Sequence, residues 1–154
     1  KRVFGFLLGL ARHRQDAEDL TEETFLRAWK KLHRYDSSMP MLPWLLTMAR
    51  RLSIAALRRK RPLPELAAEE TAPPNSHAER LWELAKTQLT PVAYSALWLH
   101  YCEELPLAQV AAILGKREGA VKVILHRSRK TLSECVRAPE ATTNCLPQPE
   151  FPIP

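Results

Sequence analysis

The chain has 154 residues, a net charge of +6 and an isoelectric point near 9.5, so we expect it to meet nucleic acid or another anionic surface. Hydrophobic residues make up 45% of the chain and glycine occurs only four times, which favours an all-α fold of one or two small domains. Its three irregularly spaced cysteines do not form the pattern of a disulfide framework, and no apolar run is long enough to span a membrane.

Residues 2–12 have apolar side chains at helical spacing and predict a first helix, packed on the Phe25 face of the next one. The chain begins at Lys1, inside this apolar pattern. We therefore expect that a further N-terminal piece precedes it.

Residues 16–32, DAEDLTEETFLRAWKKL, predict one helix capped by Asp16, with negative charge in its first half and positive charge at its end. Helical spacing predicts a buried face with Trp29 beside it, made of Ala17, Thr21, Phe25, Ala28 and Leu32. The opposite face holds Asp19, Glu22, Glu23 and Leu26. Such a face is typical of a solvated helix or of a docking surface.

Prolines and turn-forming residues in the segment 33–43 predict a loop with an exposed Tyr35. An exposed tyrosine ring stacks on an unpaired base, worth about 1–3 kcal/mol, although a tyrosine here is also able to fold back on the core. Residues 44–61 predict a helix whose second half is rich in arginine. Its candidate phosphate contacts are Arg50, Arg51, Arg58 and Arg59.

Residues 62–76 contain four prolines and three glutamates and predict a linker. After it, residues 77–89 and 91–101 predict two helices, the second capped by Thr90, with His100 near its end as a candidate phosphate contact. The remaining residues 138–154 form a proline-rich tail, in which Phe151 and Ile153 are candidate anchors for a groove.

Residues 107–132, LAQVAAILGKREGAVKVILHRSRKTL, predict a helix-turn-helix. The small Ala111 lets two helices approach, and Gly115 permits a tight turn between them. We predict a buried face on the second helix made of Val121, Leu125, Ser128 and Leu132, and an outward face made of Lys122, Val123, His126 and Arg127. Lysine and arginine pair with guanine edges and valine meets a thymine methyl in the major groove.

Three strings occur in this order: DAEDLTEETFLRAW, WLLTMARRLSIAALRR and GAVKVILHRSRKTL. They resemble, respectively, the polymerase-docking helix, the −10 helix and the −35 recognition helix of bacterial sigma factors of the extracytoplasmic-function (ECF) group. The resemblance covers nearly all of residues 1–136. It implies a region 2 domain over residues 1–61, a linker over 62–76 and a region 4 domain over 77–137.

The resemblance also implies roles for individual residues. It places Asp19, Glu22, Glu23 and Leu26 on the clamp helices of the largest polymerase subunit. It places Tyr35 and the four candidate arginines at the −10 element, and His100 and the outward face of residues 122–127 at the −35 element. The family often has Asn at Arg51, Ser at Val123 and Arg at Ile124. These departures leave two alternatives open, an altered promoter specificity or a partial loss of promoter binding.

As a member of this group the chain would not be an enzyme and would need no metal, cofactor or small-molecule substrate. Its partners would be core RNA polymerase, promoter DNA and an anti-sigma factor, in the cytoplasm or held at the inner membrane by that factor. Two alternatives remain open. One is a polymerase-independent helix-turn-helix regulator, which requires a dimer and a palindromic site. The other is a carboxylate metal enzyme built on residues 16–23, for which the usual Glu-x-x-His pairs are missing.

Overall fold

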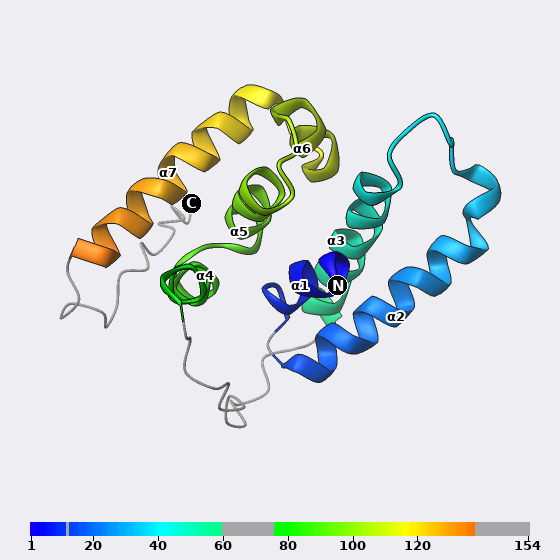
Figure 1. Ribbon diagram of the computed structural model, residues 1–154, viewed down its shortest axis with the longest axis horizontal. Helices are drawn as coiled ribbons and strands as arrows, with labels where there is room; N and C mark the ends of the chain where they lie inside the picture. The colour runs from blue at the N-terminus through cyan, green and yellow to red at the C-terminus, as the bar shows by residue number, and fades with distance from the viewer. Residues whose placement is uncertain (12, 60–75, 138–154) are drawn as a thin grey trace, which may run out of the picture.

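The computed structural model describes residues 1–11, 13–59 and 76–137, in which helices are joined by turns and loops and no strand occurs (Figure 1). Its elements are α1 (Arg2–Leu8), α2 (Arg14–Lys30), η1 (Leu32–Arg34), α3 (Met41–Arg59), α4 (His77–Gln88), α5 (Pro91–Leu97), η2 (Trp98–Cys102), α6 (Leu107–Leu114) and α7 (Glu118–Arg137). The all-α prediction is confirmed. Nearly all of the predicted linker and the whole predicted tail lie outside the described residues.

Helices α1, α2 and α3 pack on one another around the side chains of Phe6, Leu7 and Leu46, which are fully buried. The buried residues of α2 are Ala17, Thr24 and Ala28, all of them small. The Thr24 hydroxyl donates to the Leu20 carbonyl at 2.6 Å, so its polar atom is satisfied inside the helix. Small side chains at these three positions allow the neighbouring helices to approach α2 closely.

The prediction that the large apolar residues of α2 are buried is wrong. Phe25 is 50% exposed, Trp29 is 77% exposed and Leu32 is also exposed, so α1 does not pack on a Phe25 face. The residue before the helix is His13, not Asp16, which lies in the first helical turn. The prediction failed because it assigned the largest apolar side chains to the core, whereas the close helix contacts here select small ones.

Helices α4 to α7 form the second half of the molecule, and local sequence signals explain their ends. Ser76 and Glu79 form a reciprocal capping box at the start of α4. Thr90 caps α5 and Pro91 follows it, as predicted. α6 ends at Gly115, whose φ of 64° is the left-handed conformation that glycine adopts without strain.

The helix-turn-helix prediction is confirmed in its elements and its inner face. Val121, Leu125, Ser128 and Leu132 are the buried residues of α7. The prediction of one helix over residues 91–101 is less accurate. α5 ends at Leu97 and the chain continues through the wider π-helical turn η2, which leaves Tyr101 exposed.

The two halves of the molecule contact each other directly. The Tyr94 side chain of α5 lies against Gly9, directly after α1, so that a Cβ atom added at Gly9 would overlap the Tyr94 hydroxyl. Glu103, which is buried at the end of η2, accepts hydrogen bonds from Arg2 Nε at 2.5 Å and from Trp98 Nε1 at 3.1 Å. A buried carboxylate requires such partners, so this ion pair fixes α1 against η2. Helices α3 and α6 also lie side by side.

Candidate functional site

The acidic face of α2 is confirmed as a surface. Asp19, Glu22 and Leu26 are exposed, and Glu23 is half-buried. Gln15 Nε2 donates to Asp19 Oδ1 at 3.1 Å, and Arg27 Nη2 donates to Glu23 Oε1 at 2.5 Å. Both partners lie on α2 itself, so these contacts hold the carboxylates along the helix without covering them.

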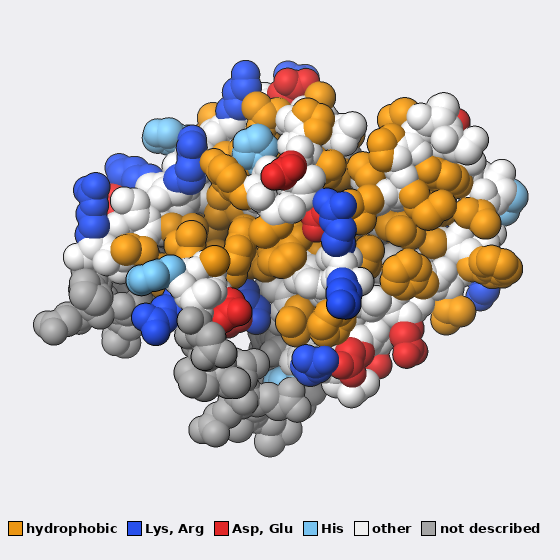
Figure 2. All heavy atoms as spheres, viewed as in Figure 1, with side chains coloured by type: hydrophobic (Ala, Val, Ile, Leu, Met, Phe, Trp, Pro, Cys, Tyr) orange, Lys and Arg blue, Asp and Glu red, His pale blue; other side chains and the backbone are white. Residues whose placement is uncertain are grey.

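An apolar patch, which sequence reasoning missed, adjoins this acidic face. Large hydrophobic side chains are exposed over the second half of α2, η1, the following loop and the first residue of α3: Phe25, Leu26, Trp29, Leu32, Met39 and Met41. Figure 2 shows hydrophobic side chains gathered on this side of the molecule, with acidic ones nearer the start of α2. Contiguous exposed apolar surface of this kind marks a site of protein interaction.

A sequence signal for the patch existed. Ala17, Thr24 and Ala28 also recur at helical spacing. Their spacing fits a buried face of small residues equally well as the predicted face that contains Phe25. A buried face made of these three small residues predicts that Phe25 and Trp29 face solvent.

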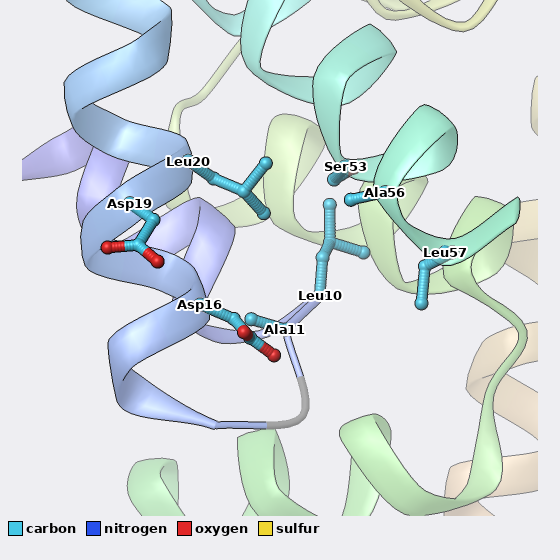
Figure 3. A pocket seen from close by; sticks show the side chains of 8 residues that line it. All are labelled: Leu10, Ala11, Asp16, Asp19, Leu20, Ser53, Ala56 and Leu57. Atoms are coloured by element: carbon cyan, nitrogen blue, oxygen red, sulfur yellow. The ribbon is translucent and has the colours of Figure 1, made fainter. Parts of the chain in front are cut away.

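A hollow of about 200 Å³ lies between the end of α1, the first half of α2 and α3 (Figure 3). Its floor is apolar, with Leu10, Leu20 and Leu57 among the lining side chains, and Asp16 and Asp19 belong to its α2 side. The hollow therefore extends the acidic face inward with a small apolar depression.

Tyr35 is not the exposed ring that the sequence predicts. It is half-buried, its ring centroid lies 5.0 Å from that of Trp44, and its hydroxyl donates to the Met39 carbonyl. In the same loop the Ser38 backbone N–H donates to Asp36 Oδ1 at 2.9 Å, which holds the pKa of that carboxyl below its usual range. The loop is thus ordered by its own contacts, and Tyr35 must leave Met39 before its whole ring becomes available.

The candidate arginines of α3 fall into two groups. Arg51, Arg58 and Arg59 are exposed. Arg50 is half-buried, and its Nη1 approaches the Ile113 carbonyl of α6 at 3.5 Å. Burial, with a smaller contribution from the charge of Arg51, lowers the pKa of Arg50. Arg50 thus faces the other half of the molecule, whereas the other three face solvent.

The outward face of α7 has the predicted composition. Lys122, Val123, His126 and Arg127 are all exposed. His100 is half-buried, and its Nδ1 lies 3.1 Å from the Leu105 carbonyl, so one ring nitrogen is engaged within its own turn. The carboxylates of α2 do not converge on a cation, since no group of three His, Cys, Asp or Glu side chains suited to a metal occurs in the described part of the chain.

Comparison with known proteins agrees with this division into two halves. The family model for sigma-70 region 2 matches residues 1–62, and that for sigma-70 region 4 matches residues 80–132. The sigma factor CarQ of Myxococcus xanthus is 33% identical over 142 residues, which cover 86% of this chain and 82% of CarQ. This chain belongs to the ECF group of the sigma-70 family of RNA polymerase sigma factors.

A further relative supports the family of this sigma factor, and two solved structures support its fold. The ECF sigma factor SigM of Bacillus subtilis is 29% identical, with 84% of this chain and 85% of SigM covered. The sigma factor RpoE of Bartonella quintana, solved with the anti-sigma factor NepR, has a TM-score of 0.70 at 20% identity, covering 88% of this chain and 89% of RpoE. CnrH, solved with the cytosolic domain of CnrY, has a TM-score of 0.67 at 19% identity, with 89% and 81% covered.

In this ECF sigma factor the region 2 match includes the acidic face, the apolar patch and the arginines of α3, whereas the region 4 match includes most of the helix-turn-helix. No helix in the described ranges is both long and apolar enough to cross a membrane.

Proposed function

We propose that this sigma factor docks on core RNA polymerase through the outer face of α2 and holds promoter DNA with α3 and α7. The observation that carries the proposal is the patch around Trp29 beside the acidic face. A tryptophan that is 77% exposed contributes nothing to the core, yet its ring supplies a large contact area to a partner. Asp19, Glu22, Glu23 and Leu26 precede this anchor along α2 and set the orientation of docking.

Promoter contacts are divided between the two domains in this proposal. Lys122, Val123, His126 and Arg127 read the upstream element in the major groove, with His100 beside them on the phosphates. Arg51, Arg58 and Arg59 follow the phosphates near the −10 element. Tyr35 and Arg50 join them only after the loop and the contact with α6 rearrange, because both are engaged within the chain.

The chain is not an enzyme and needs no metal, cofactor or small-molecule substrate in this proposal, because the chemistry of transcription belongs to the polymerase. We place it in the cytoplasm and expect an anti-sigma factor as a regulatory partner. The complex of RpoE with the anti-sigma factor NepR supports that expectation.

Co-elution of this chain with core RNA polymerase in size-exclusion chromatography tests the docking proposal. Glu23→Arg should abolish co-elution, whereas Glu134→Arg should leave it intact. The two glutamates are matched, since each pairs with a cation four residues away on its own helix, Arg27 on α2 and Lys130 on α7. Loss of co-elution with both variants, or with neither, contradicts the assigned surface. A folded wild-type chain that never co-elutes contradicts the function.

A further inference from the structure

The domain formed by α4 to α7 contains an open groove that the proposed DNA and polymerase contacts do not use. It lies between α4, η2 and α7 and has a volume of about 550 Å³. Its lining is mainly apolar and includes the aromatic rings of Trp82 and Tyr101. Leu81, Tyr101 and Val136 are exposed there, Val136 by 62% of its surface. An exposed aromatic and aliphatic lining of this size favours an occupant.

The charges at this groove are of one sign. Arg129 and Arg137 belong to its lining, and no carboxylate does among the described residues. The occupant is therefore expected to combine apolar side chains with a small number of acidic ones.

The chain itself continues from the groove. Arg137, which lines it, is the last residue of α7, and residues 138–154 follow. They lie outside the described residues. Five prolines occur among them, the large apolar residues are Leu146, Phe151 and Ile153, and the charged residues are Glu140 and Glu150. This composition matches both the apolar lining and the two arginines.

The spacing of the prolines fits the aromatic lining. Pro149-Glu150-Phe151-Pro152 has the P-x-x-P spacing of polyproline II ligands, which bind to grooves lined by aromatic rings. The turn-forming Thr143 and Asn144 precede this segment, so the chain is able to reverse direction after α7. Tethering adds to the affinity, because a short flexible connection gives an effective concentration on the order of millimolar.

We infer that residues 146–153 of this chain occupy the groove between α4, η2 and α7. Phe151 and Ile153 enter the apolar lining, the prolines lie against Trp82 and Tyr101, and Glu150 pairs with Arg129 or Arg137. The inference concerns the free chain and does not depend on the proposed contacts with polymerase or promoter.

Cys145 provides the test. In a full-length chain carrying Cys102→Ser and Cys135→Ser, a nitroxide spin label is attached to Cys145, and methyl resonances of Ile, Leu and Val are recorded before and after reduction of the label. The methyl signals of Leu81, Leu132 and Val136 should lose most of their intensity in the oxidised sample. Those of Val3 and Leu46, buried in the other half of the molecule, should keep theirs.

Two matched variants locate the contact. Val136→Asp should restore the Leu81 and Leu132 signals, because it introduces a carboxylate into the lining. Val123→Asp should not, although that valine is also exposed and lies on the same helix, because it is outside the groove. On the tail, Phe151→Ser combined with Ile153→Ser should restore the signals as well.

Three results would overturn the inference. Equal broadening of all methyl groups, or none, would show that the tail does not settle in the groove. Broadening that persists in Val136→Asp would place the tail elsewhere. In a mixed sample, one set of chains carries the spin label and a second set carries only the isotope label. Broadening of the methyl signals in that sample would identify the tail of a second copy as the occupant. Each of these results leaves the co-elution test with polymerase unaffected.

Discussion

Helices α2 and α7, of 17 and 20 residues, differ in the kind of side chain that each exposes to solvent. α7 buries branched apolar side chains and exposes cations, as expected for a helix that packs on its own domain and faces a polyanion. α2 buries small residues and exposes Phe25, Leu26 and Trp29 beside its carboxylates. These three large apolar residues of α2 thus stabilise little within the chain, and we interpret them as part of an interface with another protein.

Two leucines test this contrast between α2 and α7 through the stability of the fold. Leu125 on α7 is 4% exposed, whereas Leu26 on α2 is 61% exposed. Leu125→Ala should lower the free energy of unfolding by about 2–5 kcal/mol, since it removes buried methyl groups and leaves a cavity. Leu26→Ala should change it by less than about 0.5 kcal/mol. Urea unfolding followed by circular dichroism measures both. Similar losses from the two variants would mean that α2 packs in solution as α7 does.

Trp29→Ala should weaken binding to core polymerase about 30-fold or more, because removal of a central aromatic anchor costs about 2 kcal/mol or more. Titration of labelled chain with core enzyme gives the dissociation constant. Val123→Ala on α7 serves as the control, since it also removes an exposed apolar side chain. An unchanged dissociation constant for Trp29→Ala would remove the apolar patch from the docking surface and leave only the carboxylates.

Arg127→Ala should lower the promoter affinity of the polymerase-bound chain about tenfold and reduce the slope of log affinity against log salt by about one. Lys86→Ala removes the same charge from α4, where Lys86 pairs with Glu83 at 3.2 Å. Its effect on the salt slope should be much smaller. If the two variants behave alike, the response reports net charge and not a contact made by α7.

The two helices also differ in how well their sequences predict them. On α7 the largest apolar residues are the buried ones, so helical spacing alone identifies Val121, Leu125, Ser128 and Leu132. On α2, helical spacing is compatible with two different buried faces. The larger apolar side chains favour the face with Phe25, whereas the structure buries the face of small residues. The hydroxyl of Thr24 is satisfied within its own helix, which lets a polar residue be fully buried, and composition gives no sign of this.

Contacts between distant parts of the chain were the least predictable. Arg2 and Glu103 are 101 residues apart, and nothing in either segment marks the other as its partner. The same holds for Arg50 and the Ile113 carbonyl. The sequence predicts that Tyr35 lies on a loop, which is confirmed, but the exposure of its ring depends on contacts with the Met39 carbonyl and the Trp44 ring. Local sequence rules do not show whether such contacts form in place of contact with solvent.

Two ion pairs, one on α2 and one on α7, separate an effect on docking from an effect on folding. Glu23 and Glu134 each form an exposed ion pair within a helix turn, and such pairs contribute about 0.3–0.5 kcal/mol. Glu23→Gln and Glu134→Gln should therefore lower the free energy of unfolding equally and by less than about 0.5 kcal/mol. Only Glu23→Gln should weaken polymerase binding, because only that carboxylate adjoins the apolar patch. A large loss of stability in Glu23→Gln would show that the acidic face supports α2 itself, and its effect on polymerase would then follow from unfolding.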